Sequence, residues 1–283
     1  MNTSESSDHA AYFALRNRLL GPQRNQVLTT DQLCEAGRLM CGRPEKLSLY
    51  GVPAPEMEAR GLRILGRTAI ECTKDPHPVA VAGAIAEIEA DAPEADGEAM
   101  VVDLFCGSGN FGHHLGRRLG RPVYASELDP AVHEVSRRNL DRVGSTVDLR
   151  LADYRDLLGM LPARSERDIY LVEPAWGPAL TPDGLDLART SPPVPEIIGN
   201  IHRSRDRVPC MVVIETSDRV LHGSLETSLR DAVHLRTLSP KPFPPHRTGS
   251  RFHLYHLGKR RNRAGRAVGS GGPSPPARPG EDR

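Results

Sequence analysis

The chain has 283 residues and a formal net charge of +1. This length fits one large domain with an N-terminal extension, or one domain with a small helical cap. No apolar run approaches 18 residues and the first residues are polar without Lys or Arg, so we expect neither a membrane span nor a signal peptide. Five scattered cysteines without a C-x-x-C pair predict reduced thiols in a cytoplasmic protein and no structural metal site.

The charge is unevenly distributed along the chain. The stretch Lys259–Arg283 holds seven basic and two acidic residues, whereas residues 1–258 hold 30 basic and 34 acidic residues, a net charge of −4. Such a body offers no general attraction for a polyanion, which favours a small-molecule substrate over long RNA. The tail 259–283 is rich in Gly, Pro and Arg without an apolar face, and we expect it to be a disordered basic tail.

Residues 1–45 predict an N-terminal helical extension that acts as a lid. Two helices are expected, at about His9–Leu20 and Thr30–Cys41, and the second has a Thr-Thr-Asp start suited to N-capping. Nothing in the sequence indicates an oligomeric state.

Residues 46–98 precede the core of the protein. Here we expect a short strand pair around Leu62–Cys72 and a helix from Pro76 to Ala90, with proline in its favoured first turn. An acidic, Pro-containing linker, Asp91–Glu98, then leads into the core.

Residues 99–258 alternate strands and helices, which predicts an α/β, Rossmann-like doubly wound sheet. The predicted strands are Met100–Phe105, Pro122–Asp129, Val147–Tyr154, Asp168–Gly177, Cys210–Thr216, Val233–Leu238 and Arg251–Leu257. The predicted helices are Phe111–Leu119, Ala131–Val143 and Ser191–Ser204, the last with Ser191 as cap and Pro192 in its first turn. His113 and His114, early in the first of these helices, are expected on the surface.

Four successive strands end in residues suited to binding a nucleoside. The first ends in a glycine turn, Gly107-Ser108-Gly109, where the backbone can approach a ligand. The second ends at Glu127, an acid placed to accept hydrogen bonds from ribose hydroxyls, and the third at Asp153, which can accept from an exocyclic amine. The fourth finishes in Glu173-Pro174-Ala175-Trp176. Because ligands bind outside the carboxyl ends of such strands, all four should converge on one crevice.

This succession resembles the class I S-adenosylmethionine-dependent methyltransferases over about Thr73–Gly258. A closer resemblance is to the trimethylguanosine synthase family, which methylates the exocyclic amine of a guanine cap. The matching segments are Pro174-Ala175-Trp176-Gly177-Pro178, Leu185-Asp186-Leu187 and Ser191-Pro192-Pro193-Val194, although Glu173 replaces the family's Ser and Ala175 its second Pro. Upstream, Glu71–Pro76 lies where the family closes a segment over the methionine end of the cofactor.

The resemblance implies a seven-stranded sheet, S-adenosylmethionine as cofactor and a set of site residues. The final strand would insert antiparallel beside the fifth, so that the loop before it presents Phe243, His246 and Arg247, together with Trp176, to a substrate. The cofactor-binding residues would be Thr73, Asp103, Phe105, Gly107, Gly109, Asn110, Glu127, Asp153 and Tyr154.

Methyl transfer to an amine conjugated with a ring requires its lone pair to be oriented toward the methyl group. The Glu173 carboxylate and the Pro174 carbonyl can each accept an N–H, Trp176 can stack on the ring, and Glu173 can take the departing proton. We therefore expect catalysis by Glu173, Pro174 and Trp176 on an amine of a planar, nucleobase-like or aromatic small molecule. Arginine outnumbers lysine 33 to 4, typical of a high-GC bacterium, where a capped RNA is not expected.

Three alternatives remain open. The acceptor could be a guanine of a structured RNA, with the basic tail as an anchor. The enzyme could transfer the aminocarboxypropyl group of the cofactor instead of its methyl group. The chain could also be a non-catalytic nucleoside-binding scaffold, although a scaffold has no need of both Glu127 and Asp153.

Overall fold

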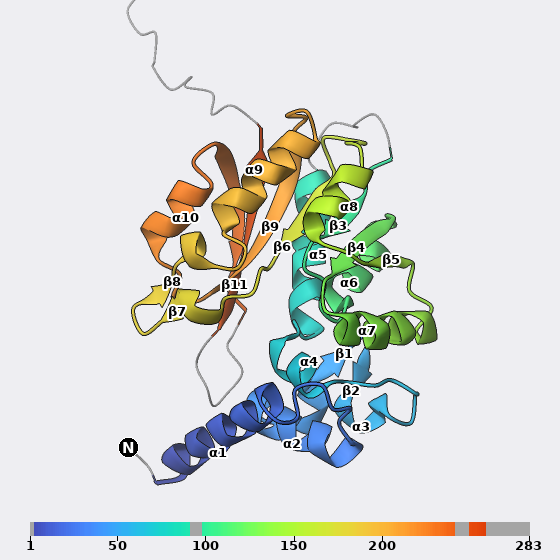
Figure 1. The fold of residues 1–283 in the computed structure, drawn as a ribbon, viewed down its shortest axis with the longest axis vertical. Helices are drawn as coiled ribbons and strands as arrows, with labels where there is room; N and C mark the ends of the chain where they lie inside the picture. Colours follow the sequence, from blue (N-terminus) through green and yellow to red (C-terminus); the bar gives the residue numbers. More distant parts are fainter. Residues whose placement is uncertain (1–2, 91–97, 241–248, 259–283) are drawn as a thin grey trace, which may run out of the picture.

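The computed structural model describes residues 3–90, 98–240 and 249–258 (Figure 1). Its centre is a seven-stranded sheet in the order β10-β11-β9-β6-β3-β4-β5. The strands are β3 (Val101–Asp103), β4 (Val123–Glu127), β5 (Val147–Leu151), β6 (Ile169–Val172), β9 (Cys210–Ser217), β10 (Ala232–Leu238) and β11 (Ser250–Leu257). All neighbours pair in parallel except β11, which is antiparallel to both β9 and β10. The predicted Rossmann-like sheet, including the antiparallel strand beside the fifth, is confirmed.

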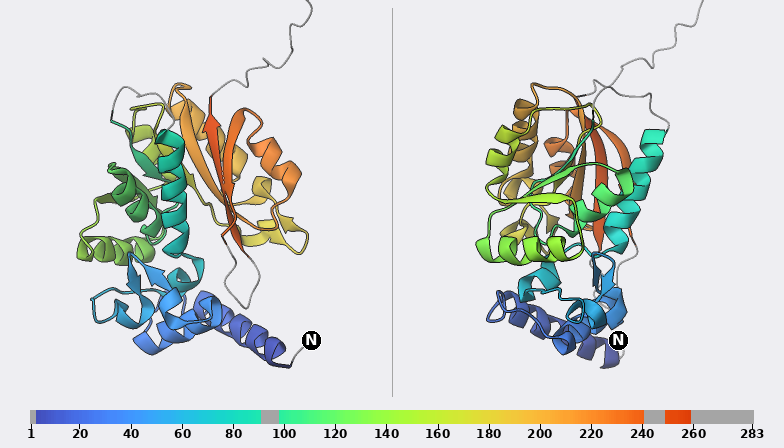
Figure 2. Two further views of the ribbon diagram at one scale, coloured as in Figure 1. Left: turned by 180° about the vertical axis from the view of Figure 1, so that it is seen from behind. Right: turned by 90° about the vertical axis from the view of Figure 1, so that its right-hand side faces the viewer.

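Helices cover both faces of this sheet (Figure 2). α5 (Pro76–Ala90) and α6 (Asn110–Leu119) pack on one face, and α8 (Tyr154–Met160), α9 (Val194–Ser204) and α10 (His222–Ser228) lie on the other. α7 (Pro130–Arg142) packs beside β4 and β5. The central strands are apolar on both faces because alternate residues enter different cores. The side facing α5 and α6 receives Val101, Ile169, Leu171, Met211 and Val213, and the opposite side receives Val102, Tyr170, Val172, Val212 and Ile214.

The N-terminal unit comprises residues 3–75, which lie beyond the carboxyl ends of the parallel strands (Figure 1). It contains α1 (Thr3–Leu20), α2 (Thr30–Cys41), a 3₁₀ helix (Pro44–Lys46), β1 (Ser48–Leu49), β2 (Val52–Pro53), α3 (Ala54–Met57) and α4 (Gly66–Glu71). Buried side chains from Leu15 to Cys72 form one hydrophobic cluster, which also takes in Leu140 of α7. Both predicted helices are present, and Thr29 caps α2 in a capping box with Gln32.

The strand pair predicted around Leu62–Cys72 is wrong. That segment makes a single bridge, Val27 to Leu65, and continues into α4 because Gly66, Thr68 and Ala69 pack as a helical face against the N-terminal core. The strand pair of this region is instead β1–β2, joined by a tight turn at Tyr50 and Gly51 with φ of 57° and 78°. Two successive positive φ angles are typical of a two-residue hairpin turn.

The start predicted for the helix at Ser191 is also wrong, because α9 begins at Val194 with Pro193 as its N-cap residue. Each residue that precedes a proline is disfavoured in helical conformation, so the Pro192-Pro193 pair delays the helix. Ser191 instead donates its backbone N–H to the carbonyl of Ala175, 3.0 Å away, which holds the segment against the end of β6.

No helix among the described residues is long and apolar enough to span a membrane. The predicted basic tail, 259–283, and the predicted acidic linker apart from Glu98 fall outside the described residues.

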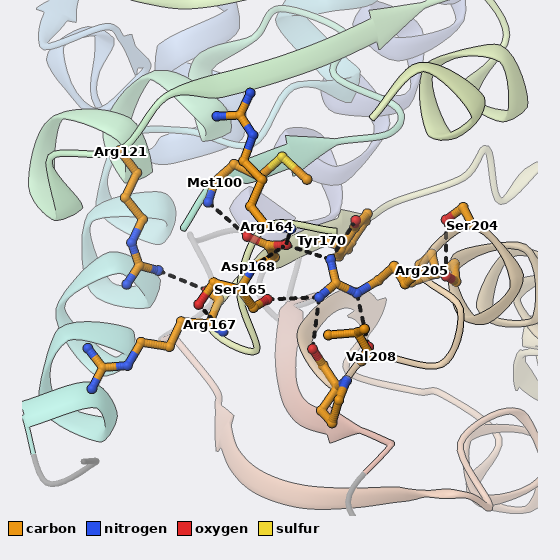
Figure 3. A network of polar contacts seen from close by, with 12 residues as sticks. Met100, Arg121, Arg164, Ser165, Arg167, Asp168, Tyr170, Ser204, Arg205 and Val208 are labelled. Carbon is orange, nitrogen blue, oxygen red and sulfur yellow. Dashed lines mark hydrogen bonds and ion pairs between the residues drawn. The ribbon is translucent and has the colours of Figure 1, made fainter. Parts of the chain in front are cut away.

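A buried ion pair closes the amino edge of the sheet (Figure 3). Arg205 and Asp168 are 1% and 0% exposed, and Arg205 Nη1 donates to Asp168 Oδ2 over 2.6 Å. The remaining guanidinium donors reach Tyr170 and the carbonyls of Ser165, Val208 and Pro209. Asp168 also accepts from the backbone N–H of Met100, which ties β3 to β6. Because both charges are fully partnered, this pair is a structural element of the fold.

We expect Arg205→Leu to lower the free energy of unfolding by about 3–5 kcal/mol, because Asp168 would keep a buried charge without its partner. Urea unfolding followed by circular dichroism measures this. Arg203→Leu, at an exposed position two residues earlier, is the matched control and should change stability by less than about 0.5 kcal/mol. Equal stability of the two variants would contradict a structural role for the pair.

Candidate active site

The glycine turn follows β3 and leads directly into α6. Gly107 and Gly109 have φ of 52° and 74°, a conformation that side chains disfavour. A Cβ at Gly107 would meet no atom within 4 Å, whereas a Cβ at Gly109 would lie 2.9 Å from Leu140 Cδ1. Gly107 therefore leaves open space on the outside of the turn, and Gly109 permits close packing against α7.

Glu127, at the end of β4, holds this turn. Its Oε2 accepts the N–H of Gly107 over 3.1 Å, and its Oε1 accepts the N–H of Asp129 over 2.7 Å. Burial raises the pKa of Glu127, while these N–H groups and Arg67 of α4 oppose the shift. Arg67 also pairs with Asp129, so a cation of the N-terminal unit lies at this strand tip.

Asn110 joins the N-terminal unit to the glycine turn. The residue is fully buried; its Oδ1 accepts the N–H of Tyr50 over 2.7 Å and its Nδ2 donates to the carbonyl of Thr73 over 2.9 Å. The Tyr50 hydroxyl donates to the carbonyl of Ser108 over 2.5 Å. The sequence singled out Asn110 and Thr73 but missed Tyr50, which no local pattern distinguishes from a core tyrosine.

Thr73 lies just before α5 and contacts two carboxyl groups. Its Oγ1 is 2.7 Å from Glu215 Oε2 and 3.3 Å from Glu173 Oε2. Burial and the neighbouring carboxyl raise the pKa of Glu173, and burial raises that of Glu215. Sequence reasoning missed Glu215, although an acid within the apolar run CMVVIETS is itself a signal of a special environment.

Asp103 is a third carboxyl on the same face of the sheet. It is 4% exposed, and its Oδ2 has no hydrogen-bond partner among the described residues. Burial raises the pKa of Asp103 to about 7, although backbone N–H groups of Gly112 and Phe105 favour the charged form. A buried acceptor without a partner costs free energy, and a ligand that donates a hydrogen bond would recover it.

The corner after β6 places its predicted residues at the same edge. Glu173 is partly exposed, Pro174 is buried, and Trp176 is partly buried against the core on the α8 and α9 face. A short 3₁₀ helix, Gly177–Ala179, follows immediately.

Asp153 and its neighbours lie at the end of β5. Asp153 caps α8, with its Oδ1 2.8 Å from the N–H of Arg155, and it pairs with the Arg155 guanidinium. Tyr154 is buried, accepts a hydrogen bond from Asn200, and packs its ring 5.0 Å from that of Phe105. These contacts explain the local fold, and the cofactor roles of Phe105, Asp153 and Tyr154 stay predictions.

The surface position expected for His113 is wrong. It is 4% exposed, Nδ1 lies 2.9 Å from the Ser145 hydroxyl, and burial lowers its pKa to about 4. His114 is partly buried and pairs with Asp75. Both face the N-terminal unit, whose packing over α6 was not visible in the helix pattern. Phe243, His246 and Arg247 lie outside the described residues and stay predictions.

Comparison with solved structures identifies the fold. A putative class I S-adenosylmethionine-dependent methyltransferase from Listeria monocytogenes superposes with a TM-score of 0.51 and 11% identity, covering 67% of this chain and 61% of that one. The chain has the class I methyltransferase fold. A putative methyltransferase from Escherichia coli (TM-score 0.43, 14% identity, 67% of this chain and 90% of that one) was also found. A magnesium protoporphyrin IX methyltransferase from Synechocystis with bound S-adenosylmethionine was found as well (TM-score 0.42, 16% identity, 64% of this chain and 79% of that one). No family model and no curated protein matches the sequence.

The raised pKa of Asp103 predicts how Asp103→Asn changes stability with pH. The folded state binds a proton more tightly than the unfolded state, so this carboxyl stabilises the fold below its ordinary value of 3.8 and loses that contribution as pH rises to about 7. Relative to wild type, Asp103→Asn should therefore gain stability between these pH values, by up to roughly 4 kcal/mol. Urea unfolding across this pH range measures the difference.

Asp183→Asn is the matched control, because that side chain is exposed in the turn between β7 (Leu180–Thr181) and β8 (Gly184–Leu185). Its stability difference from wild type should be constant over the same range. A constant difference for Asp103→Asn as well would show that Asp103 ionises as an ordinary surface carboxyl.

Proposed function

We propose that this protein is an S-adenosylmethionine-dependent methyltransferase that methylates an amine of a planar, nucleobase-like or aromatic small molecule. When bound, the cofactor supplies an electrophilic methyl group on a sulfonium. The residues of the chain then bind the two reactants, orient the amine and accept its proton.

A continuous series of hydrogen bonds along one sheet edge carries this proposal. It runs from Glu127 to Gly107, through the turn to Asn110, then to Thr73 and on to Glu173. These groups come from β4, the β3–α6 turn, the segment before α5 and the end of β6. Class I folds bind ligands at the carboxyl ends of their parallel strands, so the linked residues lie where both reactants are expected.

The residues at this edge fit the cofactor. The open space beside Gly107 allows close approach to the backbone, and each Glu127 oxygen, which accepts one N–H, retains a lone pair for a ribose hydroxyl. The unpartnered Asp103 Oδ2 is an acceptor suited to the ammonium group of the methionine part. Thr73 and Asn110 would hold the segment that covers this part, and Phe105, Gly109, Asp153 and Tyr154 would complete the binding surface.

The residues after β6 suit an amine on a flat ring. Glu173 and the Pro174 carbonyl would each accept an N–H, and Trp176 would stack on the ring and fix its plane. Glu173 would also accept the proton that the nitrogen loses, since its raised pKa makes it a stronger base than an ordinary glutamate. The resemblance of this corner to trimethylguanosine synthases supports a guanine-like acceptor.

The charge of the chain supports a small acceptor over a long RNA. The −4 net charge of residues 1–258 gives a polyanion no general attraction. The five thiols are free, which supports a reducing compartment such as the cytoplasm.

We expect S-adenosylmethionine to bind the purified protein, and Glu127→Ala to weaken binding by about tenfold or more, or ~1.4 kcal/mol, through loss of a charge-assisted partner of the ribose. Calorimetric titration measures both. Glu134→Ala, a carboxylate on the outer part of α7, is the control and should bind as wild type does. Unchanged binding in Glu127→Ala would remove its ribose role.

A panel of guanosine, adenosine and aromatic amines, incubated with protein and S-adenosylmethionine, should yield one product heavier by a methyl group in mass spectrometry. Glu173→Gln should retain cofactor affinity but lower turnover at least tenfold, because the amide cannot accept the proton.

Other outcomes of this panel contradict the proposal in different ways. Transfer of the larger aminocarboxypropyl group would replace methylation as the activity. Methylation of RNA alone would assign a polymeric substrate, and absence of S-adenosylmethionine binding would leave a nucleoside-binding scaffold.

A further inference from the structure

The pairing of β6 with β9 brings Glu173 and Glu215 together. The strands run in parallel with Val172 opposite Ile214, so the next position on each strand places Glu173 beside Glu215. Residues two positions earlier, Leu171 and Val213, lie in the core under α5 and α6. Because side chains alternate along strands, both carboxyl groups are directed to that face. The start of α5, with Thr73 before it, closes over them.

The contacts of these two groups favour a shared proton. The Thr73 hydroxyl lies within hydrogen-bond distance of both carboxyls, yet it has one proton and can donate to one of them. Toward the other it can act as acceptor, which requires a protonated carboxyl. Glu215 also lies close enough to Glu173 for its charge to raise the pKa of Glu173.

The surroundings disfavour two negative charges. Asp103 on β3 adds a further carboxyl on the same face, and the buried Cys72 thiol lies nearby. Among the described residues, Ser250 of β11 and Lys74 favour the charged form of Glu215 and oppose the rise in its pKa. Lys74 Nζ donates a hydrogen bond to the carbonyl of Ile70, so one of its N–H groups is already used by the backbone. Burial and repulsion by Glu215 therefore raise the pKa of Glu173, and burial raises that of Glu215.

We propose that Glu173 and Glu215 act as one proton-accepting pair, bridged by Thr73, that holds a single proton and a single negative charge. Glu215 is 5% exposed and Glu173 is partly exposed, so Glu173 meets the acceptor and Glu215 is a positioning residue behind it. This inference rests on the proposed function for the identity of the proton donor. The methylated nitrogen loses one proton, the pair changes from singly to doubly protonated, and its charge from −1 to zero. The proton then leaves to solvent.

Titration of the purified full-length protein without cofactor or substrate tests the pair. Carbon-13 NMR of protein labelled at glutamate carboxyls should show Glu173 and Glu215 titrating in two coupled steps, one of them well above the ordinary glutamate range. Glu215→Gln is an isosteric change that keeps a polar partner for Thr73. In this variant Glu173 should titrate in one step, at least about one pH unit below the higher of the two wild-type steps. Glu196→Gln, an exposed carboxylate of α9, is the control and should leave Glu173 unchanged.

The pH dependence of turnover gives a second reading. The acidic limb of the rate profile reports the step between the doubly and the singly protonated pair, in which the partner carboxyl is uncharged, so it should change little in Glu215→Gln while the higher titration step disappears. A merely structural loss would lower the rate at every pH without removing that step. If Glu215→Gln does not fold, the titration of Glu215 in Glu173→Gln tests the same coupling. Independent titration of both groups in the ordinary range would overturn the pair, even in an active methyltransferase. A protein that shows coupled titration but binds no S-adenosylmethionine would instead contradict the proposed function.

Discussion

The buried amide of Asn110 is the interaction on which the site depends. It accepts a hydrogen bond from Tyr50 and donates one to Thr73, and together with the Tyr50 hydroxyl on the Ser108 carbonyl it holds the N-terminal unit against the glycine turn. Without this bond, the segment before α5 would lose its link to the start of α6. The Thr73 hydroxyl would then be held less firmly beside Glu173 and Glu215. The N-terminal unit therefore contributes side chains to the candidate site.

Buried carboxyl groups have different surroundings at the two edges of the sheet. At the amino edge, Asp168 has the Arg205 guanidinium and several N–H donors, so its charge is balanced and the arrangement stabilises the fold. At the carboxyl edge, Asp103, Glu173 and Glu215 are gathered on one face, and among the described residues Lys74 is the cation that acts on Glu215. Burial of several carboxyls close together raises their pKa values and lowers the stability of the fold. Such a loss of stability is typical of sites that act on ligands.

Much of the architecture was predictable because it depends on local patterns. The helices at Thr30–Cys41 and Pro76–Ala90 begin and end where capping and proline chemistry indicated. The sheet strands lie within a few residues of their predicted ranges because apolar runs bounded by glycine and acidic residues have few alternatives, although the strand predicted at Asp168–Gly177 already ends at Val172. Two of the errors came from contacts between distant segments. The Leu62–Cys72 stretch has strand-like apolar residues but packs as α4 on the N-terminal core, and His113 is buried by that same unit.

The sequence by itself determined the strand–turn–helix at Gly107, the acids at successive strand tips and the Glu-Pro-x-Trp corner, since each is a property of a few consecutive residues. The tertiary structure decided which of these groups share a proton and which lie unpaired. Glu215 meets Glu173 because β6 and β9 pair in a particular register, and Thr73 reaches both across 100 and 142 residues of chain. Strand register and the docking of the N-terminal unit follow from the packing of the whole core, which no short stretch of sequence specifies.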